Sequence, residues 1–252
     1  MEIELDQARI EAIMLAGVRI VAFLVIAPPF SYKGIPARVK AMLAIGLALA
    51  VSPQVTDAYE TGGTGQYIGA LVLELVVGAA LGFLVLVVFS AIQSAGSLID
   101  LFGGFSLAQG FDPQSMVNGA QFTRLFQLTA LTLLFASDGY QLIIGGLIRT
   151  FSALPLGGGL DLAEPAEALT NAVTGLFLAA VQIAGPLIVV LFLADVGLGL
   201  LTRVAPALNA FALGFPLKIF ITLSLGSVVF IALPRVVSTL ADKAAGLLMG
   251  VG

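Results

Sequence analysis

Six charged side chains lie inside or directly beside long apolar runs of this sequence: Arg19, Glu74, Asp100, Asp138, Asp195 and Arg203. An unpaired charge in the hydrocarbon of a membrane costs roughly 3 kcal/mol or more. Such groups pair within the chain, pair with another subunit, or face a water-filled path for protons or ions. The residue types alone leave these three possibilities open.

Other chemistry is restricted by the absence of two residue types. The chain has no Cys and no His, so it lacks the thiolate and imidazole groups of common zinc, haem and iron–sulfur sites and of Cys or Ser–His catalysis. We therefore expect no cofactor and no enzymatic activity. The 11 Lys and Arg residues are scattered singly and the net charge is −4, which argues against a nucleic-acid partner.

The stretch from Asp195 to Lys218 concentrates polar residues and helix breakers between two apolar runs. Its members are Asp195, Gly197, Gly199, Arg203, Pro206, Asn209, Pro216 and Lys218. On a continuous helix Asp195 and Arg203 lie ~12 Å apart along the axis, too far for a direct pair unless the two glycines unwind it. The prolines predict a kinked helix or a tight hairpin.

Long apolar segments must position these charged groups. Of the 252 residues, 59% are hydrophobic and 10% charged, and the mean hydropathy is +1.09. Continuous apolar runs of about 20 residues favour membrane helices over alternating barrel strands. We predict an all-α, polytopic membrane protein that forms a single domain over residues 1–252. Six segments are expected: Ile10–Phe30, Pro36–Ser52, Ile68–Gln93, Leu125–Ile148, Ala168–Ala194 and Phe215–Leu233.

The third segment carries a signal for close helix packing. Gly78 and Gly82 are four residues apart among large aliphatic residues, a spacing that lets helix backbones approach closely. Glu74 precedes them on the same segment. It either extends to the membrane surface from the helix end or meets a buried partner.

Residues 94–118 are interrupted too often for a complete spanning helix. The interruptions are Gly103-Gly104, Gly110 and the pair Asp112-Pro113. Irregular backbone at membrane depth is tolerated only where protein buries it or water lines it. The segment is therefore either a candidate pore constriction or an ordinary connection packed on its own helices.

The order of these features resembles the FliR family of flagellar export-gate proteins over nearly the whole chain. The residues that carry the resemblance are Arg19, Pro29-Phe30-Ser31, Pro36 with Arg38, Gly78 and Gly82, Ala95-Gly96 with Asp100, Asp112-Pro113, Asp195, Arg203, Pro206 with Asn209 and Phe211, and Gly214 with Pro216 and Lys218. Two positions depart from the family pattern, because Ala207 replaces a frequent Gln and Tyr140 a frequent His.

This resemblance implies a non-enzymatic subunit of the type III protein export gate in the bacterial inner membrane, at the flagellar basal body. One copy would assemble with FliP-like and FliQ-like subunits, next to FlhB-like and FlhA-like components, around a channel for unfolded flagellar export substrates. The assembly would be a hetero-oligomer whose helices form hairpins in contact with membrane lipid.

The resemblance also implies roles for individual residues. The broken segment corresponds to a plug loop, with Phe105, Leu107, Phe111, Asp112 and Pro113 at the pore. Gly103, Gly104 and Gly110 would give that loop freedom to open. The polar residues expected at contacts between subunits are Arg19, Glu74, Asp100, Asp195, Arg203, Asn209 and Lys218.

Two other functions fit the same sequence. An ion- or proton-coupled transporter of small solutes would use Glu74, Asp100 or Asp195 as its site, although no internal repeat supports it. A structural scaffold would use its charges only to pair subunits.

Overall fold

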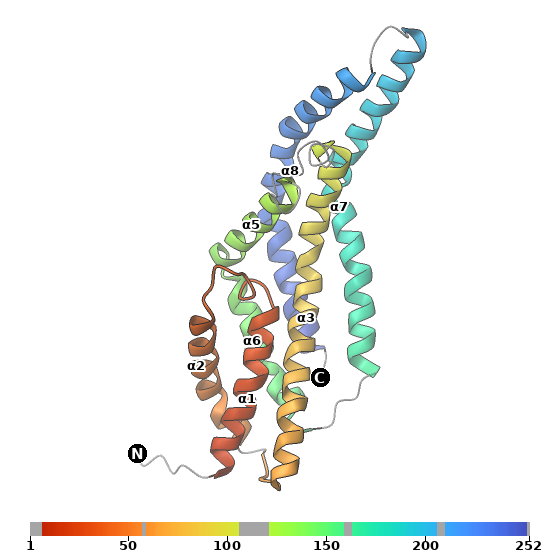
Figure 1. Cartoon of the computed structure of the whole chain (residues 1–252). Coiled ribbons are helices and arrows are strands. Elements are labelled where there is room, and N and C mark those ends of the chain that lie inside the picture. Colours follow the sequence, from red (N-terminus) through yellow and green to blue (C-terminus); the bar gives the residue numbers. More distant parts are fainter. Residues whose placement is uncertain (1–6, 57–58, 106–120, 159–162, 206–209, 251–252) are drawn as a thin grey trace. The chain divides into compact units, whose positions relative to one another are not determined.

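The described part of the chain is built from helices and short connections (Figure 1). The computed structural model describes residues 7–56, 59–105, 121–158, 163–205 and 210–250. The helices are α1 (Gln7–Ile26), α2 (Ala37–Thr56), α3 (Thr64–Phe102), α5 (Gln121–Ala136), α6 (Gly139–Ala153), α7 (Ala163–Val204) and α8 (Ala210–Met249). The predicted all-α fold is confirmed.

Three helices are much longer than the sequence predicted. α3 has 39 residues, α7 has 42 and α8 has 40, which corresponds to about 60 Å each at 1.5 Å per residue. The hydrocarbon of a bilayer is ~30 Å thick. The prediction of a broken segment from Ser94 onward was wrong for Ser94–Phe102, because α3 continues through Gly96 to Phe102.

The fourth predicted segment, Leu125–Ile148, is a bent pair of helices. The chain bends by 75° between α5 and α6, and Asp138 at the bend has a left-handed backbone with φ 55°. Gly139 is buried so closely that a Cβ atom there would lie 2.7 Å from Leu134 Cδ1. The Ser137-Asp138-Gly139 sequence is a turn signal that the hydropathy pattern conceals.

Within the described residues, four helices are long and apolar enough to cross a membrane, namely α2, α3, α7 and α8, and the α5–α6 pair makes five if it counts as one span. α1 contains three charged residues, Arg9, Glu11 and Arg19, and for this reason it is not counted among the candidate membrane helices. The sequence had counted α1 among six apolar segments.

The chain divides into two compact units. The first comprises residues 1–88, 134–173 and 239–252, and the second comprises residues 89–133 and 174–238. In the first unit α1 packs beside α2 (Figure 1). α1 also crosses α3 very closely, since a Cβ atom on Gly78 would lie 2.2 Å from the Arg19 carbonyl oxygen and one on Gly82 3.0 Å from the Phe23 carbonyl oxygen. The predicted packing role of this glycine pair is confirmed.

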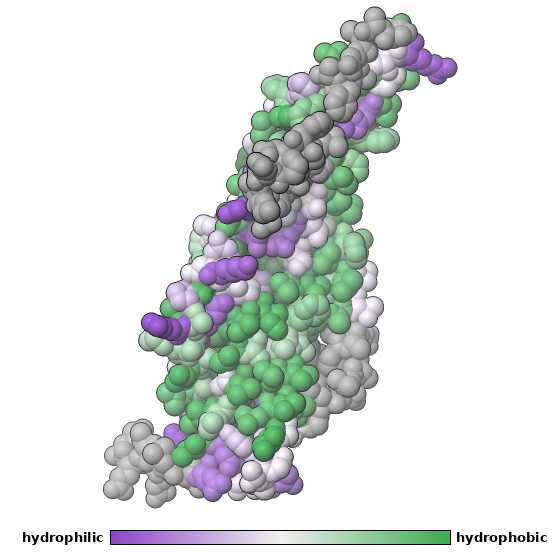
Figure 2. All heavy atoms as spheres, viewed as in Figure 1, coloured by the Kyte–Doolittle hydropathy of each residue, from purple (hydrophilic) through white to green (hydrophobic). Residues whose placement is uncertain are grey.

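Large apolar side chains remain exposed along the long helices. On α7 they extend from Phe177, which is 66% exposed, to Val204, which is 85% exposed, and on α8 Ile231 is 80% exposed. Figure 2 shows wide hydrophobic areas on the viewed face, with hydrophilic residues gathered in separate groups. Surfaces of this composition are stable in contact with lipid or with other apolar helices.

Candidate functional site

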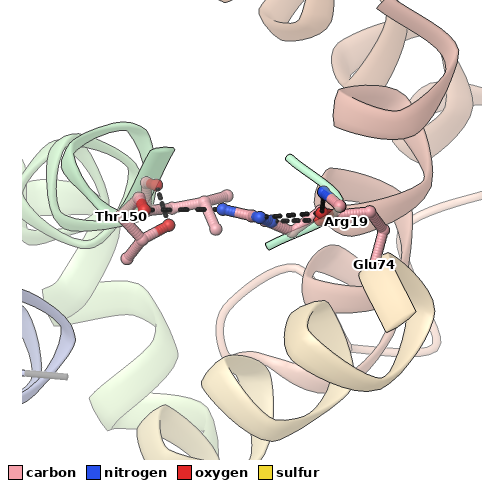
Figure 3. A network of polar contacts seen from close by, with 5 residues as sticks. Arg19, Glu74 and Thr150 are labelled. Carbon is pink, nitrogen blue, oxygen red and sulfur yellow. Dashed lines mark hydrogen bonds and ion pairs between the residues drawn. The ribbon is translucent and has the colours of Figure 1, made fainter. Parts of the chain in front are cut away.

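A buried ion pair joins α1 to α3 in the first unit. The Arg19 guanidinium donates through Nε to Glu74 Oε2 and through Nη2 to Glu74 Oε1, the latter over 3.0 Å. Figure 3 shows Arg19 reaching from Glu74 to Thr150 of α6, whose carbonyl oxygen accepts from Nη1 at 3.4 Å. This two-point geometry between a guanidinium and a carboxylate is the strongest form of side-chain ion pair.

The surroundings of this pair exclude water and occupy its remaining polar atoms. Arg19 and Glu74 are each 1% exposed, and the Phe151 ring lies 4.4 Å from Arg19 Cζ, a favourable position for a cation against an aromatic face. The Gly157 amide donates to Glu74 Oε1 over 3.1 Å. Gly157 has φ 69°, a conformation that glycine adopts without steric cost.

The arrangement decides between the two interpretations of Glu74, because the carboxylate has a buried partner instead of reaching the membrane surface. Arg19 and Glu74 are paired within the chain, and their expected role in contacts between subunits stays a prediction. Among the described residues, no buried side-chain nitrogen or oxygen lacks a hydrogen-bond partner. Buried polar groups satisfied in this way hold the elements that carry them in one arrangement.

Asp100 also takes its partners within the chain, in the second unit. Its carboxylate accepts from the Phe122 amide over 3.0 Å, from the Thr123 amide over 2.8 Å and from Thr123 Oγ1 over 2.9 Å. The two amides belong to the first turn of α5, where backbone donors have no partner inside the helix. A carboxylate there also interacts favourably with the positive end of the helix dipole.

The predicted plug is described only at its beginning. Gly103 and Gly104 end α3, and Gly104 has φ 83°, as in the left-handed residue that commonly terminates a helix. Phe105 follows and contacts Phe122 edge to face, with ring centroids 5.3 Å apart. Leu107, Gly110, Phe111, Asp112 and Pro113 lie outside the described residues. The plug role and the hinge role of the three glycines stay predictions.

The polar stretch from Asp195 on α7 to Lys218 on α8 contains an ion pair that the sequence did not assign. Lys218 Nζ lies 2.7 Å from Asp195 Oδ1, and the two side chains are 21% and 45% exposed. α7 remains helical through Gly197 and Gly199, so Asp195 and Arg203 stay on one continuous helix, as the spacing argument assumed. Arg203 lies in the last turn of α7, where a cation is favoured by the helix dipole. Asn209 lies outside the described residues.

Several residues of these sites had no assigned role in the sequence. Thr150, Phe151 and Gly157 contribute a carbonyl, a ring and an amide to the Arg19 site, and no local pattern marks them. The sequence could in principle have indicated that the backbone of Phe122 and Thr123 needs a capping partner. The residues before them, Gly119 and Ala120, have no side-chain acceptor that could cap a helix, so the helix start required a cap from elsewhere.

Comparison with known proteins places this chain among bacterial export proteins. The profile described as "Bacterial export proteins, family 1" matches residues 10–244. The chain is similar to the flagellar biosynthetic protein FliR of Escherichia coli (strain K12), at 34% identity over 82% of this chain and 79% of that protein. It is also similar to the FliR protein of Bacillus subtilis (strain 168), at 29% identity over 96% of both chains.

A relative with a different name matches a shorter part of this chain. The Yop proteins translocation protein T of Yersinia pestis is 28% identical over 58% of this chain and 56% of that protein.

Proposed function

The chain belongs to the bacterial export proteins of family 1, and from this premise we propose that it is a non-enzymatic channel subunit of a flagellar type III protein export gate. It would combine with FliP-like and FliQ-like subunits, as one copy in a hetero-oligomer, to form the pore for unfolded export substrates. The site of assembly would be the inner membrane at the flagellar basal body. Flagellar relatives match 82–96% of the chain and the Yop relative 58%, which favours the flagellar system.

The observation that carries the proposal is the mismatch between helix length and membrane thickness. α7 is about twice as long as the hydrocarbon is thick, and its exposed apolar side chains continue from Phe177 to Val204. This exposed run spans about 40 Å at 1.5 Å per residue, of which lipid tails ~30 Å thick can cover about three quarters. Apolar helices of partner subunits would cover the rest.

The fixed partners of the acidic groups favour a channel subunit over a proton- or ion-coupled transporter. Glu74 binds a guanidinium, Asp100 binds the amides of a helix start, and Asp195 pairs with Lys218. A transport site needs an acidic group that exchanges its partner during the cycle. These three carboxylates instead connect elements of the chain.

Within the pore, the apolar residues around Phe105 and Phe111 would form the plug. Narrow hydrophobic constrictions exclude water and ions and still separate when a chain passes. The glycine pair at 103–104 would be the position from which the plug moves.

Photo-crosslinking to partner subunits tests the proposed assembly. A photoreactive residue at Val204 or Ile231, both at least 80% exposed, is expected to crosslink to FliP-like or FliQ-like chains in membranes that contain the whole apparatus. The same residue at buried Leu187 or Leu233 is the control and should give much less crosslinking. Crosslinks only to lipid from both exposed positions would contradict the assembly.

A further inference from the structure

α2 differs from the longer helices because its length matches the thickness of a membrane. It has 20 residues, which corresponds to about 30 Å, the thickness of the hydrocarbon of a bilayer. One side of α2 is used inside the first unit, where the helix packs against α1 and α6. The buried residues on that side include Ala44, Ala48 and Val51.

The opposite side of α2 is apolar and exposed, and a cation stands at its start. Met42, Ile45 and Leu49 are each more than half exposed. Arg38 precedes them at the spacing of one helix face, and we call these four residues the outer face of α2. From Arg38 to Leu49 this face covers about 17 Å along the axis, close to the hydrocarbon depth of one leaflet.

Two more cations lie at the same end of α2. Lys33 is exposed in the connection between α1 and α2, and Lys40 lies in the first turn of α2. Backbone hydrogen bonds fix the connection, among them those from the Tyr32 amide to the Pro29 carbonyl oxygen and from the Ile35 amide to the Tyr32 carbonyl oxygen. The Tyr32 side chain is exposed, and tyrosine is enriched at membrane surfaces. The connection thus places a cation and an aromatic ring directly before the helix.

Among the described residues, no carboxylate pairs with these three cations. The sequence also contains no Asp or Glu between Glu11 and Asp57. Basic residues beside an apolar membrane helix attract the headgroups of anionic lipids. One lipid molecule complements both parts of this surface, because its phosphate can meet the cations while its acyl chain covers the apolar residues below them.

We propose that the outer face of α2 and the cations at its basic end, Lys33, Arg38 and Lys40, form a binding site for an anionic phospholipid. The guanidinium of Arg38 can hold a phosphate through two parallel hydrogen bonds, and the flexible lysine side chains extend to the level of the headgroup. The bound lipid fixes the depth of the first unit in the membrane. The inference concerns attachment to the membrane and does not depend on the proposed pore.

A photoreactive residue at position 42 tests this contact in the complex that co-purifies with the chain. The complex is reconstituted in vesicles of phosphatidylcholine with phosphatidylglycerol as the minor component, and after irradiation the mass of the chain identifies the attached lipid. Phosphatidylglycerol should be enriched among the adducts over its share in the vesicle. The same photoreactive residue at buried Ala48 is the control and should attach little lipid.

Charge variants in the position-42 background test the basic end. R38Q should lower the enrichment of phosphatidylglycerol about fivefold, the factor expected for one cation at an anionic membrane surface. R38K keeps the charge and should retain most of the enrichment. R9Q is the matched control, because Arg9 lies in the first turn of α1 and α1 and α2 run in opposite directions (Figure 1). It should leave the enrichment unchanged.

Three results would overturn the proposal. Adducts of phosphatidylglycerol in proportion to its share in the vesicle would exclude a headgroup site. Attachment of position 42 only to a protein chain would show that another subunit covers the outer face. An equal loss of enrichment in R9Q and R38Q would show a general attraction between charged surfaces instead of a local site.

Discussion

At the scale of single residues, the pair of Arg19 and Glu74 is the contact whose loss should destabilise the fold most. Removing one partner of a buried ion pair leaves the other charge unsatisfied and costs about 3–5 kcal/mol. We expect R19M and E74Q each to lower the unfolding temperature in detergent strongly. The double variant R19M/E74M should recover much of the loss, because it leaves no buried charge.

A partly exposed pair provides the control. Asp195 and Lys218 are partly exposed, and such pairs contribute about 0–1 kcal/mol, so D195N should change the unfolding temperature little. A double variant R19M/E74M that loses as much stability as the two single variants together would contradict the account of Arg19 and Glu74 as a coupled pair.

Tyr59, in the connection between α2 and α3, predicts a dependence of stability on alkaline pH. Its hydroxyl donates to Glu11 Oε2 over 3.0 Å, and burial, followed by this hydrogen bond, raises the pKa of Tyr59 from 10.0 to about 12. Because the folded state binds this proton more tightly, its contribution is complete below pH 10 and is lost as the pH rises toward about 12.

The measurement is the unfolding temperature of the wild type and of Y59F between pH 9 and about pH 12. The wild type should lose stability more steeply than Y59F over this range. Parallel curves for the two proteins would exclude the contribution of Tyr59.

At the scale of elements, the crossing of α1 and α3 depends on Gly78. A methyl group there would lie 2.2 Å from the Arg19 carbonyl oxygen, so G78A must separate the two helix backbones and should cost about 1–3 kcal/mol. Gly69 is the control on the same helix, because its Cβ position meets nothing within 4 Å. There G69A should stabilise the helix by up to about 1 kcal/mol. Equal unfolding temperatures for G78A and G69A would show that the helices do not cross there.

The sequence predicted local features of these elements better than it predicted their partners. The apolar runs indicated the helices, and the spacing of Gly78 and Gly82 indicated a close crossing, because both signals lie within a few residues. The partner of Glu74 is 55 residues away and that of Asp100 is 22 residues away. Such pairings follow from the arrangement of helices, which hydropathy does not specify.

The sequence also did not predict correctly where some helices end and where the chain bends between helices. The first interruption that the sequence indicated, Gly103-Gly104, does follow the end of α3 at Phe102, but the predicted broken segment began too early, at Ser94. The bend at Asp138 was missed because the short turn signal lies between the longer apolar runs of α5 and α6, and a hydropathy window averages over one turn.

At the scale of the whole molecule, the long helices with exposed apolar faces predict that this apolar surface is fully covered only when the chain is assembled with other subunits. α3, α7 and α8 each exceed the membrane thickness about twofold. The buried charges that the structure describes are meanwhile satisfied within the chain. We therefore expect partner subunits to be recognised mainly through apolar helix surfaces, with polar contacts at the partly exposed pair of Asp195 and Lys218.

We propose that this chain lines a pore through which unfolded proteins pass. The most direct test is site-specific photo-crosslinking from Phe111, in cells that contain the assembled apparatus and an export substrate stalled in transit. We predict a crosslink between position 111 and the stalled substrate, and none when the substrate lacks its export signal. Absence of the crosslink in an active, assembled gate that holds a stalled substrate would contradict the claim.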